Sequence, residues 1–181
     1  EPPLTVAIGK TVTLGDNVYV NCNLTLVDDY TIRIGNGVLI APNVVIITTG
    51  HPVHHKLREH GEMYSFEVNI GDNVWIGSNV VICPGVTIGE NSIIGAGSIV
   101  LHDVAGQLVA AGNPCRVIRE ITDRDLEYYF RDLRVADQQE PNAGSVSETS
   151  FLVQRSTNNR TNRAECFSGM RIKNTQRSEL R

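Results

Sequence analysis

A six-residue repeat constrains the fold of this chain more than any other feature of its sequence. Each hexad has an aliphatic residue first, a small residue second and a turn-forming residue third or fourth. Five hexads follow one another without a break from Ile70 to Ile99. Earlier hexads begin at Ile8, Leu14, Ile34 and Ile40. Self-similarity at a short fixed period predicts a solenoid, in which each repeat packs against its neighbours.

Six residues are enough for one short strand and one corner. Side chains alternate along a strand, so the aliphatic first residue points into the interior. Gly, Asp and Asn suit the corners, where tight or left-handed backbone is required. Stacked coils place equivalent side chains about 4.8 Å apart, and each buried Ile or Val contributes roughly 1.5–3 kcal/mol. We therefore predict an all-β solenoid of stacked parallel coils.

The repeat lapses once, over residues 48–69. Ile46 and Ile70 are 24 residues apart, a multiple of six, so the frame resumes after an inserted loop. Long insertions in a regular solenoid are more often functional than accidental. We therefore expect residues 1–121 to form a β-helix that carries this loop.

The chain after residue 121 has a different pattern. Thr122 is a plausible helix N-cap, and the following apolar residues have helical spacing. The apolar stripe consists of Leu126, Tyr129, Phe130 and Leu133. We predict a short C-terminal helix over 122–136 that packs on the body. Residues 137–181 contain few apolar residues, and we expect them to form a disordered tail.

Composition indicates which binding partners and which cellular location to expect for the protein. The chain has 181 residues, a net charge of −4 and 41% hydrophobic residues, which excludes a wholly disordered chain. Without a basic excess we expect neither a nucleic-acid partner nor a membrane partner. The four cysteines form no C-x-x-C pair and no secretory leader is evident, so we expect reduced thiols and a cytoplasmic location.

The inserted loop is rich in histidine. Four of the five histidines lie in it, and His51 precedes Pro52, which biases it to an extended backbone. A general base that works at neutral pH needs a pKa near 7 and a position within hydrogen-bond reach of the proton that it takes. Histidine has these properties, so the loop is the first place to look for catalysis.

The sequence around the loop resembles a known family. The stretch TGHPVHHKLREHGEMYSF, with NCNLTLVDDY before it and NVWIGSNVVICPGVTIG and AAGNPCRVIREI after it, is similar to bacterial galactoside and maltose O-acetyltransferases. The resemblance extends over about residues 6–134 and implies a left-handed parallel β-helix. With the three hexads per turn that it also implies, residues 8–117 would form about six coils. It also implies transfer of acetyl from acetyl-CoA to a hydroxyl of a sugar of galactoside, maltose or glucose type. The enzyme would be a homotrimer with active sites between subunits and no metal.

The resemblance also assigns roles to individual residues on the acceptor side. His51, in the T-G-H-P motif, would be the general base, and Asn21 would stabilise the oxyanion. Tyr19, Asn21, Asp29 and Met63 would contact the acceptor sugar. A fixed amide donor suits an oxyanion, and a carboxylate such as Asp29 accepts hydrogen bonds from sugar hydroxyls.

On the donor side the resemblance assigns two small residues and a basic set to acetyl-CoA. Ser78 and Ala96 would line the pantetheine arm. Leu101 and His102 stand where the family commonly has Thr-Lys. Arg116 and Arg119 would lie near the nucleotide phosphates, for which guanidinium groups are geometrically suited.

Other interpretations of the same residues remain open. Asn21 could be a corner asparagine, Asp29 could end a strand, and the two arginines could pair with Glu120, Asp123 or Asp125. The chain could also be a non-catalytic solenoid, either an interaction module or a truncated relic. A zinc carbonic-anhydrase type is a third possibility, because His55 and His60 have H-x₄-H spacing.

Overall fold

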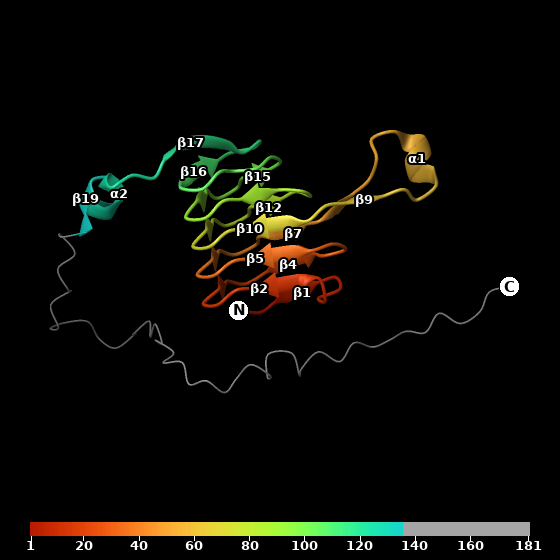
Figure 1. Cartoon of the computed structure of the whole chain (residues 1–181), viewed down its shortest axis with the longest axis horizontal. Coiled ribbons are helices and arrows are strands. Elements are labelled where there is room, and N and C mark those ends of the chain that lie inside the picture. The colour runs from red at the N-terminus through yellow and green to blue at the C-terminus, as the bar shows by residue number, and fades with distance from the viewer. Residues whose placement is uncertain (136–181) are drawn as a thin grey trace, which may run out of the picture. The chain divides into compact units, whose positions relative to one another are not determined.

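The computed structural model describes residues 1–135, which form a β-helix of stacked parallel strands (Figure 1). Three sheets form its faces, here named A, B and C. Face A consists of β1 (Leu4–Val6), β4 (Leu24–Val27), β7 (Val45–Ile47), β12 (Val81–Ile82) and β15 (Ile99–Val100). Face B consists of β2 (Val12–Leu14), β5 (Ile32–Ile34), β10 (Val68–Ile70) and β13 (Thr87–Ile88). Face C consists of β3 (Tyr19–Val20), β6 (Leu39–Ile40), β11 (Trp75–Ile76), β14 (Ile93–Ile94), β16 (Leu108–Ala111) and β17 (Arg116–Glu120).

The chain visits faces A, B and C in turn, once per coil, so the predicted β-helix is confirmed. Face A has five strands, which makes five coils in the described part of the chain. The residue count predicted about six. The difference lies between Ile46 and Ile70, which are 24 residues apart where one hexad step takes 6. The loop therefore uses 18 residues, the length of one coil, without adding a coil.

The interior is a set of aliphatic ladders, as the hexad predicts. On face A, Leu26 pairs with Ile46, which pairs with Ile82 and then Val100. The corresponding ladder on face C runs through Ile40, Ile76, Ile94 and Ala110. All of these side chains are buried, with at most 4% of their surface exposed. The coils thus stabilise one another through contacts between equivalent positions.

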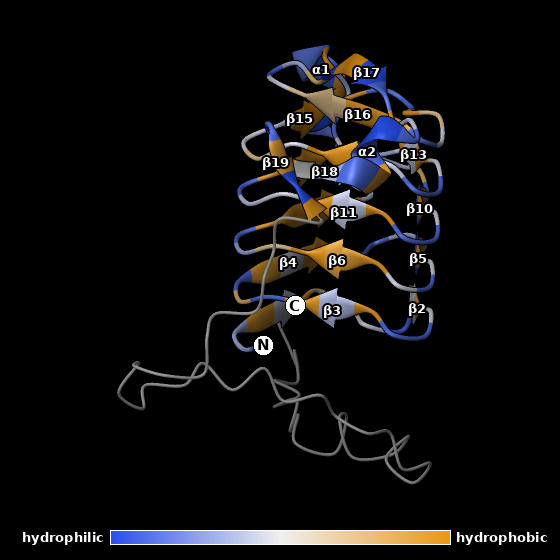
Figure 2. Ribbon diagram, turned by 90° about the vertical axis from the view of Figure 1, so that its left-hand side faces the viewer, coloured by the Kyte–Doolittle hydropathy of each residue, from blue (hydrophilic) through white to orange (hydrophobic). Residues whose placement is uncertain are grey.

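Asparagine shapes the corners between faces. Asn43 and Asn79 adopt left-handed backbone, with φ of 61° and 59°. The Asn43 side-chain amide donates to Asn79 Oδ1 over 3.1 Å, and Asn23 donates to Asn43 over 2.9 Å. Asparagine tolerates this conformation better than other non-glycine residues. Figure 2 shows hydrophilic corners stacked on both sides of the strands of face C, of which β6 is among the most hydrophobic.

The C-terminal part of the described chain differs from its prediction. The helix expected over 122–136 is shortened to α2 (Arg124–Glu127), and β18 (Tyr128–Phe130) then pairs antiparallel with β19 (Leu133–Arg134). The helix ends at Tyr128, whose backbone is extended with φ of −121° and ψ of 117°. Arg131 has a φ of 53° and lies in the turn between β18 and β19. The guanidinium groups of Arg124 and Arg134 lie 5.0 and 5.4 Å from the Tyr128 ring centroid. The predicted tail, 137–181, lies outside the described residues.

The described residues contain only two helices, both short. Besides α2 there is α1 (His55–Glu59), which lies in the inserted loop. Within residues 1–135, no helix has the length and apolarity needed to cross a lipid bilayer.

The aliphatic ladders make a direct prediction about stability. We expect Ile82→Ala to lower the free energy of unfolding by about 2–5 kcal/mol, because it leaves a cavity in the middle of the face A ladder. Val53→Ala is the matched control, since Val53 is 95% exposed in the loop and its truncation should change stability by less than about 0.5 kcal/mol. Chemical denaturation measures both, and equal effects would contradict the stacked core.

Candidate active site

The inserted loop begins and ends on the corner between faces A and B, here named the A–B edge. Its base is a short antiparallel pair, β8 (Thr49–Gly50) with β9 (Tyr64–Ser65). Gly50 leaves room for the Tyr64 ring, because a Cβ on it would lie 2.5 Å from the Tyr64 hydroxyl oxygen and the ring would have to shift. The loop extends from the body and carries α1 at its tip (Figure 1). It thus presents the residue after β8, His51, outside the coil.

The His51 side chain is exposed and anchored at one ring nitrogen. Its Nδ1 lies 3.1 Å from the Glu62 carbonyl oxygen. A carbonyl can only accept, so Nδ1 carries the hydrogen, and in the neutral ring the free lone pair is on Nε2. This arrangement presents a base to the solvent side of the loop.

Two residues that the resemblance assigns to the acceptor sugar lie on the same edge. Asp29 is exposed in the corner of the second coil, directly below the loop's own coil. Met63 is half-exposed and follows Glu62, whose carbonyl holds His51. The A–B edge therefore brings a base, a carboxylate and an apolar thioether into one region of the chain.

A different edge, between faces C and A, carries Asn21, Ser78 and Ala96. Strand register places Asn21 beside Ala41 in the next coil, and Ser78 beside Ala96 further up the same edge. Gly97 N–H donates to the Ser78 carbonyl oxygen over 2.8 Å, which fixes the two upper corners against each other. Both side chains are small, so the edge offers a shallow surface.

Asn21 is not the corner asparagine of its turn. That position belongs to Asn23, which has a φ of 61° and joins the amide ladder. Asn21 Oδ1 accepts the Cys22 N–H over 2.8 Å. Within residues 1–135, no acceptor binds its Nδ2, so the amide is oriented by its oxygen and its N–H groups remain available.

A single chain does not bring the two edges together. The A–B edge holds His51, Asp29 and Met63, whereas Asn21 lies on the C–A edge, next to Tyr19 on face C. The strands of face A separate the two edges. Tyr19 is half-exposed and donates to Glu1 Oε1 over 3.2 Å. The candidate base and oxyanion donor therefore belong to different sides of one molecule.

The basic donor-side residues lie at the C-terminal end of the β-helix. Leu101 and His102 follow β15 on the A–B edge, and Arg116 and Arg119 lie in β17. Arg119 forms a bidentate ion pair with Asp125, with N–O distances of 2.7 and 2.8 Å. The pairing considered as an alternative is therefore present for Arg119, and Arg116 donates to the carbonyl of Cys115.

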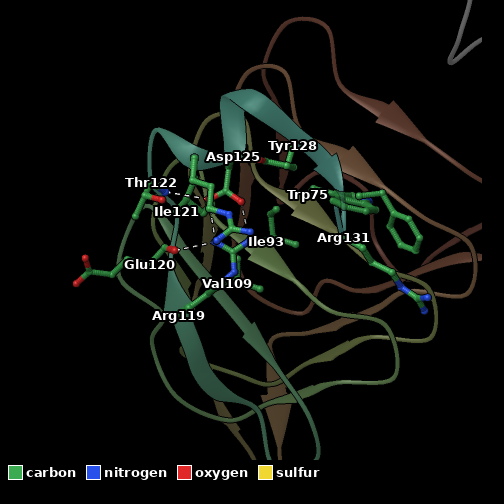
Figure 3. Close-up of a pocket in the computed structure, with 12 residues that line it drawn as sticks. Trp75, Ile93, Val109, Arg119, Glu120, Ile121, Thr122, Asp125, Tyr128 and Arg131 are labelled. Carbon is green, nitrogen blue, oxygen red and sulfur yellow. Dashed lines mark hydrogen bonds and ion pairs between the residues drawn. The ribbon is translucent and has the colours of Figure 1, made fainter. Parts of the chain in front are cut away.

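A cavity of about 940 Å³ lies beside Arg119 (Figure 3). Trp75, Ile93 and Val109 of face C form its apolar floor, and residues of α2 and β18 close the other side. Arg124 and Arg131 also line it, so an apolar surface lies next to guanidinium groups. Such a combination suits a ligand with a flat apolar part and phosphates.

The histidines of the loop tip do not form a metal site. Among residues 1–135, no group of three or more His, Cys, Asp or Glu side chains is placed to hold a metal ion. His55 begins α1 and His60 is its C-cap, whereas His54 is the N-cap and accepts the Lys56 N–H. His54 and His55 stack, with ring centroids 4.9 Å apart.

Comparisons with known proteins place the chain among acetyltransferases. Residues 67–102 match the family model for the bacterial transferase hexapeptide (six repeats). The chain is 64% identical over 135 residues to the galactoside O-acetyltransferase of Escherichia coli (strain K12), covering 75% of this chain and 66% of that protein. It is 50% identical over 121 residues to the galactoside O-acetyltransferase of Lactococcus lactis subsp. lactis (strain IL1403), covering 67% and 58%.

Comparison with solved structures gives the same result as comparison with the curated sequences. A galactoside acetyltransferase in complex with coenzyme A has a TM-score of 0.74 and 64% identity, and the match covers 75% of this chain and 68% of that one. The chain belongs to the hexapeptide-repeat acetyltransferase family. A maltose O-acetyltransferase from Clostridium difficile 630 has a TM-score of 0.65 at 46% identity, covering 66% and 64%. The chain spans about three fifths to two thirds of the length of the curated relatives it matches.

Sequence reasoning missed two residues that shape this candidate site and named a third only as one of several alternatives. Glu62 acts through its backbone, which no sequence pattern reveals. Asp125 holds Arg119, and their spacing of six residues gave only one of several possible pairings. Thr48 is buried although polar, and it follows Ile46 and Ile47 as Asp28 follows Leu26 and Val27, a signal that was present in the repeat.

The Arg119–Asp125 ion pair predicts a lowered pKa for Asp125. The guanidinium of Arg119 and then the Thr122 N–H lower the pKa of Asp125 from 3.8 to about 2. Because the pKa is lowered, the ion pair is fully formed at pH values above 3.8, the ordinary pKa of this carboxyl group. The pair is lost as the pH falls through about 2. Carboxyl-carbon NMR titration measures this, and Arg119→Gln should return the pKa toward its ordinary value. A wild-type midpoint near 3.8 would contradict the ion pair.

Proposed function

We propose that this chain transfers the acetyl group of acetyl-CoA to a hydroxyl of a sugar, with galactosides as the first acceptors to test. The observation that carries the proposal is the His51 ring, fixed at Nδ1 by Glu62 with Nε2 free. It lies within a loop of a chain that is 64% identical to a galactoside O-acetyltransferase. The free thiols of Cys22, Cys83 and Cys115 support the cytoplasmic location that we also propose.

The proposed chemistry needs one base and one amide donor. His51 Nε2 takes the proton of the acceptor hydroxyl while the hydroxyl oxygen forms a bond to the thioester carbonyl carbon. The Asn21 Nδ2–H donates to the resulting oxyanion. As the carbonyl re-forms, the C–S bond breaks and the imidazolium of His51 returns the proton to the departing thiolate. The products are the O-acetylated sugar and free coenzyme A.

Other residues bind and orient the two substrates. Asp29 accepts hydrogen bonds from sugar hydroxyls, and Tyr19 and Met63 supply the apolar surface of the acceptor site. Ser78 and Ala96 line the pantetheine arm. The nucleotide end lies toward the C-terminal end of the β-helix, near Leu101, His102, Arg116 and Arg119.

The complete site is proposed to form between two copies in a homotrimer. The support is geometric: His51 and Asn21 lie on the two opposite borders of face A, so one chain cannot offer both to one substrate. A cyclic assembly that sets the A–B edge of one copy against the C–A edge of the next solves this with one repeated interface.

Replacing the base tests the mechanism. We expect His51→Ala to lower kcat by roughly 10²–10⁴, because the acceptor hydroxyl loses its general base. Acetyl-CoA binding, measured by calorimetry, should be unchanged. His55→Ala is the matched control, since His55 lies in the same loop, is exposed and should leave kcat within about twofold. Unchanged turnover in His51→Ala would remove the mechanism, and no thiol release by wild type with any sugar would favour a non-catalytic solenoid.

Mixing two inactive variants tests the shared site. His51→Ala and Asn21→Ala chains, unfolded together and refolded at equal ratio, should recover about a quarter of the wild-type activity. The reason is that a quarter of the interfaces then pair an intact His51 with an intact Asn21. A site contained within one chain would give no recovery. The separately refolded variants are the control.

A further inference from the structure

A buried polar cluster lies where the inserted loop joins the β-helix. Asp28 and Thr48 occupy equivalent positions in consecutive coils, one after β4 and the other after β7, and neither has any exposed surface. The proposed catalytic groups flank this cluster, with Asp29 beside Asp28 and His51 three residues after Thr48. No step of the proposed reaction uses the cluster itself.

The Thr48 hydroxyl bridges the turn that contains Asp29. It donates to the Val27 carbonyl oxygen over 2.8 Å and accepts the Tyr30 N–H over 3.0 Å. These are the first carbonyl and the fourth N–H of a four-residue turn, which ordinarily bond directly to each other. The inserted hydroxyl therefore holds the turn open, and Asp29 is its third residue.

Thr48 is also tied to the base of the loop. Its N–H donates to the same Val27 carbonyl over 3.0 Å, and its own carbonyl accepts the Phe66 N–H over 2.8 Å. One residue thus connects the turn of Asp29 with both arms of the loop that carries His51. The link is short and buried, so it is rigid.

Asp28 fixes the same turn from the opposite side. Its carboxylate accepts the N–H groups of Ile8 and Gly9 over 2.9 and 2.7 Å and the Thr11 hydroxyl over 2.7 Å. Burial alone would raise the pKa of Asp28, but these donors outweigh it and the pKa is lowered. The turn is therefore clamped between the first coil and the third.

We propose that Thr48 is a positioning residue, whose hydroxyl sets the Asp29 carboxylate relative to His51 and thereby governs use of the sugar acceptor. The part of this inference that concerns use of the sugar acceptor rests on the proposed function. Without the hydroxyl, the Val27 carbonyl and the Tyr30 N–H can satisfy each other only if the turn closes, and closure of the turn moves Asp29. Misplacement of a substrate-binding group by about 1 Å is enough to slow a reaction substantially.

The test compares three variants in acetyl transfer. Thr48→Val removes the hydroxyl at nearly constant volume, and we expect kcat/KM for the sugar to fall about 10–100-fold. The KM for acetyl-CoA should stay within about twofold, because the donor-side residues are not attached to this turn. Thr48→Ser retains the hydroxyl and should recover kcat/KM to within about threefold of wild type.

Ser92→Ala is the matched control for a purely structural effect. The Ser92 hydroxyl is equally buried, donates to the Ala105 carbonyl and accepts the Leu108 N–H, so it bridges a turn in the same way on another edge. It should lower thermal stability as Thr48→Val does, yet leave kcat/KM for the sugar within about threefold. Equal acceptor losses in both variants, or equal losses in Thr48→Val and Thr48→Ser, would overturn the positioning role.

A crystal structure of Thr48→Val separates this inference from the proposed function. We expect the Asp29 carboxylate to shift by about 1 Å or more relative to the His51 ring. Wild-type protein that transfers acetyl to no sugar would overturn the proposed function, while a shifted Asp29 would still support the positioning role of the hydroxyl. An unmoved Asp29 would overturn the inference whatever the activity.

Discussion

The contact between equivalent aliphatic side chains in successive coils is the interaction on which this structure depends. Ile40, Ile76 and Ile94 lie in register on face C, as do Leu26, Ile46 and Ile82 on face A. Each coil repeats the one below it. The same shift along the helix axis therefore aligns the backbone hydrogen bonds and brings the apolar side chains into contact. Every edge of the β-helix then becomes a straight column on which side chains of neighbouring coils lie at fixed spacing.

Those columns explain how a simple repeat can support a chemically complex site. The A–B edge gains a loop at the third coil, and the loop places His51 beyond the coil surface while Asp29 remains in the coil below. The C–A edge has only short corners, so Asn21, Ser78 and Ala96 stay close to the body. Projection on one edge and a shallow surface on the other are complementary shapes, which is the physical basis for proposing that two copies share each site.

Two of the buried polar side chains hold the coil corner and the entrance of the loop together through hydrogen bonds. Polar side chains are costly in an aliphatic interior unless each finds a partner, and none of the buried side-chain polar atoms in residues 1–135 lacks one. Thr48 meets this requirement by bonding to backbone that would otherwise form an ordinary turn. Asp28 meets it by accepting hydrogen bonds from Ile8, Gly9 and Thr11 of the first coil. Their bonds hold the coil corner and the loop entrance together, so the site rests on the rigid part of the fold.

The sequence by itself determined the solenoid of stacked strands, the inward set of aliphatic residues, and the position of the loop and of the histidine in it. A six-residue period matches one strand and one corner, and its interruption is visible in the sequence. Tertiary structure alone decided that the loop adds no coil, that the helix after Thr122 is only four residues long, and that Arg119 pairs with Asp125. It also decided that Asn23, not Asn21, forms the corner, and that the Glu62 carbonyl orients His51. These outcomes depend on backbone conformation and on contacts between residues whose spacing follows no period, so no pattern in the chain encodes them.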